Sequence, residues 1–231
     1  MKFKERLLQG LLLRRYKRFF VDIKYKSKII TAHCPNSGSM KGLLDPKNKV
    51  WFSKVDDPKR KLKYTLQMIE INNKLVGINT HLTNKIVFES LTKKKIKSLT
   101  KFANIKAEVK YSDSTRFDFL ISNGKKKFFL EVKNVTLLRE KNIAEFPDAI
   151  TSRGTKHLNK LVDAKNKGYE SYILFLIQRE DCKLFKVAKD IDKSYKKSFD
   201  KALNNGVKVL CYDCKLNPEE IKINNEIKYA K

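Results

Sequence analysis

The amino-acid sequence predicts a mixed α/β fold in two parts, a small N-terminal β-barrel and a larger C-terminal domain in which helices and strands alternate. Three observations lead to this prediction. Short segments of alternating apolar residues, separated by turns, extend to about residue 80. Two helix–glycine–strand units follow residue 150. Hydrophobic residues make up 41% of the 231-residue chain, so both parts can bury a core.

The first part has the pattern of strands joined by tight turns. Segment 18–25 alternates with period two, and further strands are expected at 28–33, 50–54 and 64–79. The last of these is interrupted at Asn72-Asn73-Lys74, as a hairpin would be. About five strands in this length predict a barrel of the oligonucleotide/oligosaccharide-binding (OB) type over residues 1–82, a fold that commonly binds oligonucleotides.

The second part, residues 83–231, changes to a helical period. Thr83 is expected to cap a helix that runs through Val87 and Leu91. Two strands are expected at 116–121 and 128–132. Helices at 157–167 and 194–205 then end at Gly168 and Gly206, which supply left-handed C-caps, and lead into strands at 172–177 and 207–212.

The charge is strongly unbalanced, since 52 Lys and Arg against 25 Asp and Glu leave a formal net charge of +27. Lysine-rich composition is also what a low-GC genome encodes. So large an excess nevertheless favours a polyanionic partner, because each neutralised phosphate releases counterions. The charged first residues and the lack of an apolar run near the roughly 20 residues of a membrane span predict no secretory signal, no membrane partner and a cytoplasmic location.

The four cysteines are too scattered for a disulfide scaffold. Cys211 and Cys214 lie three residues apart in a predicted strand and would therefore point to opposite faces. No second pair of ligands accompanies them for a structural zinc. Structural roles are expected for them and, because neighbouring strand residues diverge, for His33-Cys34 as well.

The pattern that carries chemistry is a hairpin with Asp118 on one strand and Glu131 and Lys133 on the other. A two-residue turn at Asn123-Gly124 would place Asp118 opposite Phe129, and Arg116 opposite Glu131. One face would then hold only apolar side chains, namely Phe117, Phe119, Phe128, Leu130 and Val132. The other face would hold Arg116, Asp118, Glu131 and Lys133, with the two carboxylates as diagonal neighbours about 7–8 Å apart.

Two carboxylates that meet on a sheet repel each other unless a proton or cation lies between them. Mg²⁺, or Mn²⁺ in its place, is the expected cation, because it takes hard oxygen ligands and keeps waters for substrate phosphates. Lys133 shares the face of Glu131 and could orient a metal-bound water or offset phosphate charge. The alternative is a solvated amphipathic hairpin with an ordinary Arg116–Glu131 ion pair. The pattern predicts no small-molecule cofactor.

Three further basic groups are candidate nucleic-acid contacts. One begins the helix after the hairpin, where helix starts favour phosphate. One combines cations with Tyr16 and Phe19, as single-strand grooves do, although these rings could equally belong to the barrel core. One is a predicted loop that would contact the backbone of DNA. In order, the groups are Arg153, Lys156 and His157; Arg14, Arg15, Lys17 and Arg18; and Lys59, Arg60 and Lys61.

Nearly the whole chain resembles the sugar fermentation stimulation protein (SfsA) family of bacteria and archaea. The strings that carry the resemblance are LRRYKRF at 13–19, AHCPNSG at 32–38, PKRKL at 58–62, NTHL at 79–82, EVKNVT at 131–136, FPDA at 146–149 and RGTKHL at 153–158. The resemblance implies an N-terminal OB-like domain and a C-terminal domain similar to PD-(D/E)XK nucleases. It also implies non-specific DNA binding and a regulatory role in sugar (maltose) metabolism.

On this resemblance, Asp118, Glu131 and Lys133 match the acid, acid and lysine of the nuclease motif. Phe117 replaces the proline of the motif's name. Many such nucleases place another acid on the preceding helix, which makes Glu89 a candidate metal ligand. The helical period places Glu89 on the far side from Val87 and Leu91.

Three hypotheses therefore follow. The first is a non-specific DNA-binding protein with a metal-dependent nuclease site. The second is a DNA-binding regulatory factor, linked to sugar metabolism, that keeps the nuclease fold without turnover. The third is an RNA-binding or RNA-processing protein, since a barrel of this type does not distinguish the two nucleic acids. The sequence leaves the oligomeric state open, and no helix-turn-helix or zinc finger indicates base-specific reading.

Overall fold

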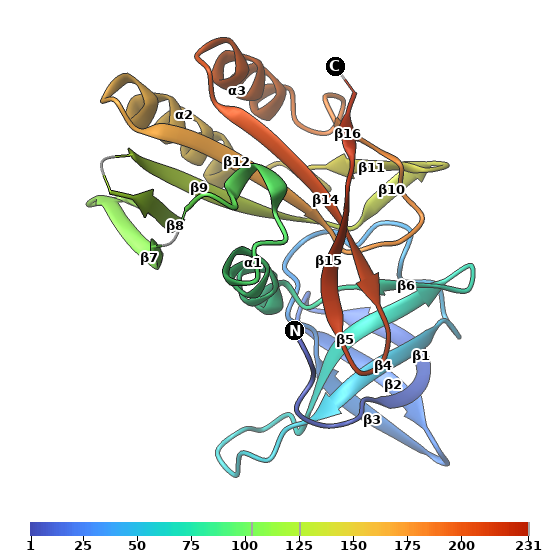
Figure 1. The fold of residues 1–231 in the computed structure, drawn as a ribbon. Coiled ribbons are helices and arrows are strands. Elements are labelled where there is room, and N and C mark those ends of the chain that lie inside the picture. The colour runs from blue at the N-terminus through green and yellow to red at the C-terminus, as the bar shows by residue number, and fades with distance from the viewer. Residues whose placement is uncertain (103, 125, 231) are drawn as a thin grey trace.

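A computed structural model describes residues 1–102, 104–124 and 126–230. The chain forms a β-barrel, drawn in blue and cyan in Figure 1, next to a mixed sheet covered by helices. This arrangement confirms the predicted mixed α/β fold with an N-terminal barrel. None of the helices in the described parts of the chain is long and apolar enough to cross a membrane.

The barrel consists of five strands closed by a pairing between its third and fifth members at His33 and Thr65. Their hydrogen-bonded order is β3-β2-β1-β4-β5, and β6 extends the sheet beyond β5. Positive φ angles at Asn72 (51°) and Asn73 (61°) form the predicted hairpin turn. The strands are β1 (Leu8–Tyr16), β2 (Phe20–Tyr25), β3 (Lys28–His33), β4 (Lys49–Lys54), β5 (Tyr64–Ile71) and β6 (Lys74–Gly77).

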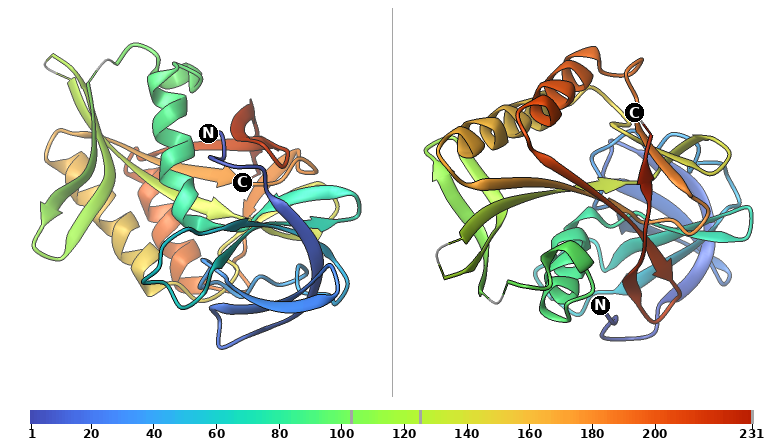
Figure 2. Two further views of the ribbon diagram at one scale, coloured as in Figure 1. Left: turned by 90° about the horizontal axis from the view of Figure 1, so that it is seen from below. Right: turned by 45° about the horizontal axis from the view of Figure 1, so that its top comes forward.

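The large sheet of the second part has six strands in the order β15-β14-β12-β9-β8-β7. Helices α2 and α3 cover one face and α1 covers the other, as both views in Figure 2 show. A small sheet, β10-β11-β13-β16, lies beside it. The bounds are β7 (Asn104–Ser112), β8 (Thr115–Asn123), β9 (Lys126–Val135), β10 (Leu137–Glu140), β11 (Ile143–Phe146), β12 (Glu170–Ile177), β13 (Leu184–Val187), β14 (Lys208–Leu216), β15 (Ile221–Glu226) and β16 (Lys228–Tyr229).

The helices are α1 (Thr83–Thr92), α2 (Ser152–Asn166) and α3 (Lys193–Asn204), with short 3₁₀ turns η1 (Thr80–Leu82) and η2 (Lys97–Leu99). Gly168 and Gly206 have positive φ angles just past α2 and α3, as predicted. The prediction that Thr83 caps α1 was wrong. The chain enters α1 from η1, and the Asn79 side chain instead accepts from the backbone N–H of His81 at the start of that turn. The α2 helix begins five residues earlier than predicted, because Thr151 caps it by accepting from Gly154 N–H.

The predicted register of the central hairpin was wrong by two residues. Phe119 pairs with Leu130 and Asn123 with Lys126, so Asn123 belongs to the strand rather than to the turn, and Gly124, which follows it, has a φ of 56°. Asp118 is therefore not opposite Phe129. An even shift preserves which residues share a face. Asp118 still lies near Glu131, because its Oδ2 accepts from the backbone N–H of Val132 and the charge of Glu131 acts on it.

The prediction that the apolar residues of the hairpin all share one face was also wrong, because Phe117 lies on the other side of the sheet. Pairing of β8 with β9 stops at Phe119, and the start of β8 turns toward α2. Phe117 consequently packs in the core beneath α2, whereas Phe119 packs in the core beneath α1. Cys211 and Cys214 likewise lie in opposite cores, and all four cysteines are free and buried, as predicted for structural residues.

The barrel is joined to the second part by backbone contacts. Gly77 N–H donates to the carbonyl of Gln178 at 2.9 Å, and Val76 bridges to Arg179. A Cβ at position 77 would lie 2.3 Å from Oε1 of Gln178, so only glycine permits this approach. On the other side, Thr80 Oγ1 donates to the carbonyl of Pro35 at 2.8 Å. These contacts place the end of β3 beside η1 and the start of α1.

Candidate active site

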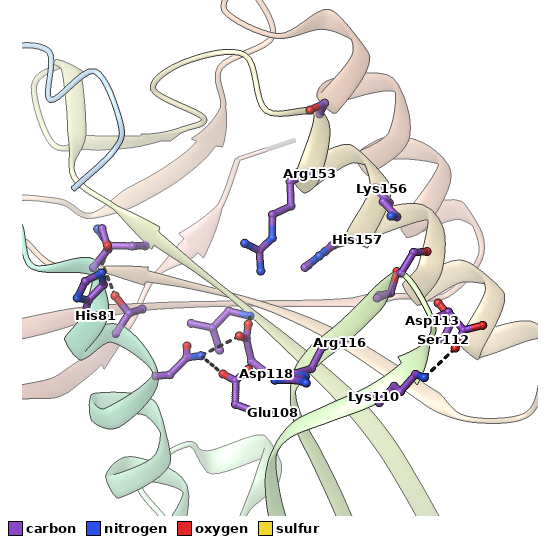
Figure 3. A pocket seen from close by; sticks show the side chains of 18 of the residues that line it. His81, Glu108, Lys110, Ser112, Asp113, Arg116, Asp118, Arg153, Lys156 and His157 are labelled. Atoms are coloured by element: carbon purple, nitrogen blue, oxygen red, sulfur yellow. Dashed lines mark hydrogen bonds and ion pairs between the residues drawn. The ribbon is translucent and has the colours of Figure 1, made fainter. Parts of the chain in front are cut away.

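A cavity of about 1390 Å³ opens where η1, the start of α1, the β7–β8 hairpin and the start of α2 meet. Its wall is mostly polar and basic. Figure 3 shows Arg153, Lys156 and His157 on α2 and Asp118 and Arg116 on β8 around the same space. The charged and histidine side chains that line it are His81, Lys85, Glu108, Lys110, Asp113, Arg116, Asp118, Arg153, Lys156 and His157.

Asp118 is the carboxylate of the predicted motif that lies on the cavity wall. Its Oδ1 accepts from the Asn84 amide at 2.7 Å, and its Oδ2 accepts from the backbone N–H of Val132 at 2.7 Å. Burial and the negative charge of Glu131 raise the pKa of Asp118 to about 6, against the lowering effect of these hydrogen bonds. The raised pKa means that the ionised form of Asp118 is destabilised in the folded protein, and a bound cation would offset this.

Glu131 lies beside it on β9 and is 2% exposed. Its Oε1 accepts from Lys133 Nζ at 2.6 Å and from His157 Nδ1. Burial alone would raise the pKa of Glu131, but Lys133 and His157 outweigh that effect and lower it. The alternative of an Arg116–Glu131 ion pair is therefore wrong, because Arg116 pairs across the sheet with Lys110 and lines the cavity.

The oxygen donors of these two residues suit Mg²⁺ or Mn²⁺. Glu131 Oε2 is buried and has no hydrogen-bond partner among the residues that the structure describes. Such an atom is costly in a folded protein unless a cation or water satisfies it. Within the same residues no group of three or more His, Cys, Asp or Glu side chains converges. Waters and substrate phosphates would have to complete the coordination, as is usual for Mg²⁺.

Glu89 does not reach these carboxylates. Its side chain pairs with the N-terminal amine of Met1 at 2.8 Å and with Lys93, and it lies outside the cavity wall. Asn84, one turn nearer the start of α1, holds Asp118 instead and also contacts Glu108 at 3.3 Å. The helical period indicated the position of Glu89, whereas nothing in the sequence singled out Asn84 or Glu108.

The three residues predicted at the start of α2 all line the cavity. Arg153 and Lys156 are exposed, and His157 is buried against Glu131. Three further cations line the opposite wall, namely Lys85, Lys110 and Arg116. No sequence pattern marked these three as site residues. The cavity therefore presents positive charge on several sides of Asp118, while Glu131 is buried behind the cavity wall and neither it nor Lys133 lines the cavity.

The candidate cations of the barrel differ in how far they are already used in contacts within the protein. Arg14 donates to Asp22 at 2.8 Å and lies 5.0 Å from the centroid of the Tyr16 ring, whose other neighbour is Phe20 at 5.4 Å. Arg15 donates to backbone carbonyls of the loop after β3, including Asn36 at 2.7 Å. Tyr16 and these two arginines thus have intramolecular partners. The remaining candidates lie outside the cavity, on the exposed β1–β2 turn (Lys17, Arg18) and on the loop between β4 and β5 (Lys59, Arg60, Lys61).

Replacing Arg15 with alanine is expected to lower the free energy of unfolding by about 2 kcal/mol. The guanidinium donates to the carbonyls of Arg18, Asn36, Gly38 and Ser39. A hydrogen bond to a charged group contributes about 1.5–3 kcal/mol net, and the bonds to Arg18 and Ser39 contribute less because they are exposed to solvent. Urea unfolding followed by circular dichroism measures the change. Lys24→Ala removes one exposed cation from β2 and should change the free energy by less than about 0.5 kcal/mol. Equal effects of the two substitutions would contradict a structural role for Arg15.

Two family descriptions match the chain. One, "Sugar fermentation stimulation protein RE domain", covers residues 81–220, and the other, "SfsA N-terminal OB domain", covers residues 13–78. A protein of Pelagibacter ubique described as a sugar fermentation stimulation protein homolog is 55% identical over 228 residues, which span 99% of this chain and 98% of that protein. A homolog with the same description from Agrobacterium fabrum is 40% identical over 99% of this chain and 96% of its own length.

A solved structure has the same fold. It is titled "The structure of Pyrococcus Furiosus SfsA in complex with Ca2+" and matches with a TM-score of 0.90 and 26% sequence identity. The match covers 100% of this chain and 98% of that one. The likeness therefore extends over both the barrel and the α/β part.

Proposed function

The chain belongs to the sugar fermentation stimulation protein family, and we propose that it is a non-specific DNA-binding protein whose α/β half holds a metal-dependent phosphodiesterase site of the PD-(D/E)XK nuclease kind. One observation carries this proposal. Asp118 lines a cavity rich in cations, and behind it lies the buried Glu131, which is paired with Lys133 and has one oxygen without a partner among the described residues. A purely structural ion pair would not need the second carboxylate.

Each residue of the site has a chemical task. Asn84 and the Val132 N–H fix the orientation of Asp118, and Lys133 and His157 keep Glu131 ionised. Mg²⁺ or Mn²⁺, when bound, would polarise the phosphate and lower the pKa of a bound water. Lys133 lies within hydrogen-bond distance of Glu131 and can also offset charge that develops on the phosphate. That the relative from Pyrococcus furiosus is described with Ca²⁺ supports a site for hard divalent cations in this fold.

DNA is the proposed partner because several exposed cations of α2 and of the barrel could bind its phosphates. Arg153 and Lys156 at the start of α2 can bind a phosphate, assisted by the helix terminus. Lys59 and Lys61 on the barrel loop and Lys17 and Arg18 on the barrel turn would extend the contact along the backbone. Contacts of this type position DNA without reading its sequence.

A catalytically silent DNA-binding factor is the second candidate, because the described residues bring only two carboxylates together rather than three or more metal-ligating side chains. Its regulatory role in sugar metabolism would follow from the name that the relatives carry. A third candidate, RNA binding, rests only on the barrel. Competition among duplex DNA, single strands and RNA at one salt concentration separates DNA from RNA binding.

The direct test is incubation of the protein with supercoiled, linear and single-stranded DNA in Mg²⁺ or Mn²⁺. Product formation that stops in EDTA supports the nuclease. Binding that tightens with metal and yields no product favours the silent factor.

The double substitution Arg153→Ala/Lys156→Ala is expected to weaken DNA binding and to reduce its salt dependence. Each phosphate contact contributes about −0.9 to the slope of log K against log salt, so loss of two contacts should change the slope by about 1.8. Fluorescence anisotropy in EDTA, at salt concentrations from about 50 to about 300 mM, measures this slope. Lys222→Ala/Lys228→Ala removes equal charge from β15 and β16, outside the cavity, and should leave the slope within about 0.5. An unchanged slope for the α2 variant would contradict the assignment.

A further inference from the structure

Three aromatic rings form a row from the barrel surface to the cavity. The rings of Phe19 and His33 have centroids 6.5 Å apart and planes inclined by 27°. The rings of His33 and His81 have centroids 6.3 Å apart and planes inclined by 44°. His81 belongs to the cavity wall, where Figure 3 labels it across from Arg153 and His157. The row therefore links the barrel to the candidate active site.

The rings are not barrel core. Phe19 is 45% exposed, His81 is exposed and His33 is half-buried. Their separations lie at the upper end of the range for contacting aromatic pairs, so the rings leave much of their faces uncovered. Tyr16 differs, because its ring is stacked on Phe20 and covered by Arg14.

The row is held by the backbone. His33 pairs with Phe20 on one side and closes the barrel against Thr65 on the other. The carbonyl of Pro35, just beyond β3, accepts from both Thr80 N–H and Thr80 Oγ1, which joins it to the turn that carries His81. The backbone segments that carry the three rings are thus joined to one another without help from a ligand.

The electrostatic surroundings suit a neutral base together with its anionic phosphate as the occupant. Burial, the charge of Arg60 and the proximity of His81 lower the pKa of His33, which keeps its ring neutral and able to stack. Arg60, whose Nη2 donates to Thr65 Oγ1 at 3.3 Å, places a cation beside the rings for the phosphates. Cations along a row of rings are the pattern of single-strand grooves, where each stacked base contributes about 1–3 kcal/mol.

We propose that Phe19, His33 and His81 form a base-stacking track for a single-stranded segment of nucleic acid that extends from the cavity onto the barrel. This inference rests on the proposed function and narrows it, because it makes DNA with a single-stranded segment, rather than intact duplex, the preferred substrate class. In a duplex, the faces of the bases are already stacked on one another and cannot meet these rings.

The test measures binding of a 5′-labelled single strand, about 20 nucleotides long, and of the corresponding duplex, in EDTA so that no cleavage interferes. Phe19→Ala should weaken single-strand binding about tenfold and change duplex binding less than about twofold, with an unchanged salt slope because no charge is lost. Phe19→Trp should restore single-strand affinity. A 2-aminopurine in the strand should be quenched by the wild type and less so by Phe19→Ala. Ile29→Ala, at another exposed apolar position of the barrel, 68% exposed, is the matched control and should change neither affinity.

The outcomes separate this inference from the proposed function. If the wild type binds neither DNA form, the proposed function fails. If it binds both and Phe19→Ala weakens both equally or neither, the track is overturned while DNA binding stands.

A ribonucleotide strand of the same sequence provides a further test. A similar loss with Phe19→Ala supports stacking, which RNA and DNA bases share, and an RNA affinity that is insensitive to position 19 would contradict it.

Discussion

Replacing Glu131 with glutamine is expected to reduce metal-dependent DNA cleavage 100- to 1000-fold while DNA binding in EDTA stays within about twofold. The loss follows from removing the one negative charge that sits between Lys133 and His157 and offers its free oxygen to a cation. Glutamine retains the shape of the glutamate side chain. Its amide nitrogen would take the place of Oε2, an atom that has no hydrogen-bond partner among the described residues. Initial rates on single-stranded and supercoiled DNA in Mg²⁺ measure the effect.

The protein offers a matched control in Glu145. This residue is as buried as Glu131, at 1% exposed, and is likewise held by cations, through Arg139 at 2.6 Å and Lys186 at 3.6 Å. It lies on β11 in the small sheet and does not line the cavity. Glu145→Gln should therefore lower stability without changing the cleavage rate per folded molecule. Equal loss of activity in both variants, or full activity in Glu131→Gln, would mean that Glu131 is not part of a catalytic site.

The parts of the fold that could be predicted depend on local patterns. Asn72-Asn73, Gly168 and Gly206 mark their turns because positive φ angles favour these residue types. Residue parity along β9 placed Glu131 and Lys133 on one face, and it survived a register error because the error was an even number of residues. Local rules could not show where β8 leaves β9, since that depends on how its start packs beneath α2. Phe117 was therefore assigned to the wrong core.

The same limit applies to the candidate site. Residue type identifies Arg15 as a cation, but only the folded loop shows that its guanidinium is used on backbone carbonyls. Glu89 has the right residue type on the right helix, yet it faces Met1 and Lys93. Asn84, which donates to Asp118, and His81, which lines the same cavity, come together with β8 only through long-range packing. Sequence patterns predict the acids of the site better than the neutral groups that orient them.

Asp118→Asn is expected to stabilise the metal-free protein while removing its response to Mg²⁺. The folded state raises the pKa of Asp118 from 3.8 to about 6, so ionising this group opposes folding. That shift corresponds to at most about 3 kcal/mol, and partial exposure of the side chain reduces it to about 1–2 kcal/mol. The variant should therefore melt roughly 2–8 °C higher than the wild type at pH 8 in EDTA.

The sign of the pH dependence makes this prediction specific. A carboxyl group whose pKa is raised on folding destabilises the protein above the folded pKa and has no effect once it is protonated in both states. The stability advantage of Asp118→Asn should accordingly be full at about pH 8, shrink as the pH falls through about 6 and vanish below the unfolded pKa of 3.8. Taking the difference between variant and wild type cancels the titrating groups that do not interact with Asp118, whereas Glu131 is coupled to it and contributes to the difference.

Mg²⁺ should reverse the order of the two proteins. A cation that binds Asp118 and Glu131 stabilises the wild type by RT ln(1 + [Mg²⁺]/Kd), which reaches about 2.7 kcal/mol at 100 times Kd. The variant keeps the hydrogen bond from Val132 N–H but has lost one anionic ligand, so its melting temperature should hardly respond. A wild type that is more stable than Asp118→Asn at every pH in EDTA, and insensitive to Mg²⁺, would show that Asp118 serves the fold alone. A wild type that is less stable than Asp118→Asn in EDTA and regains stability with Mg²⁺ is the behaviour expected of a carboxylate retained for chemistry rather than for folding.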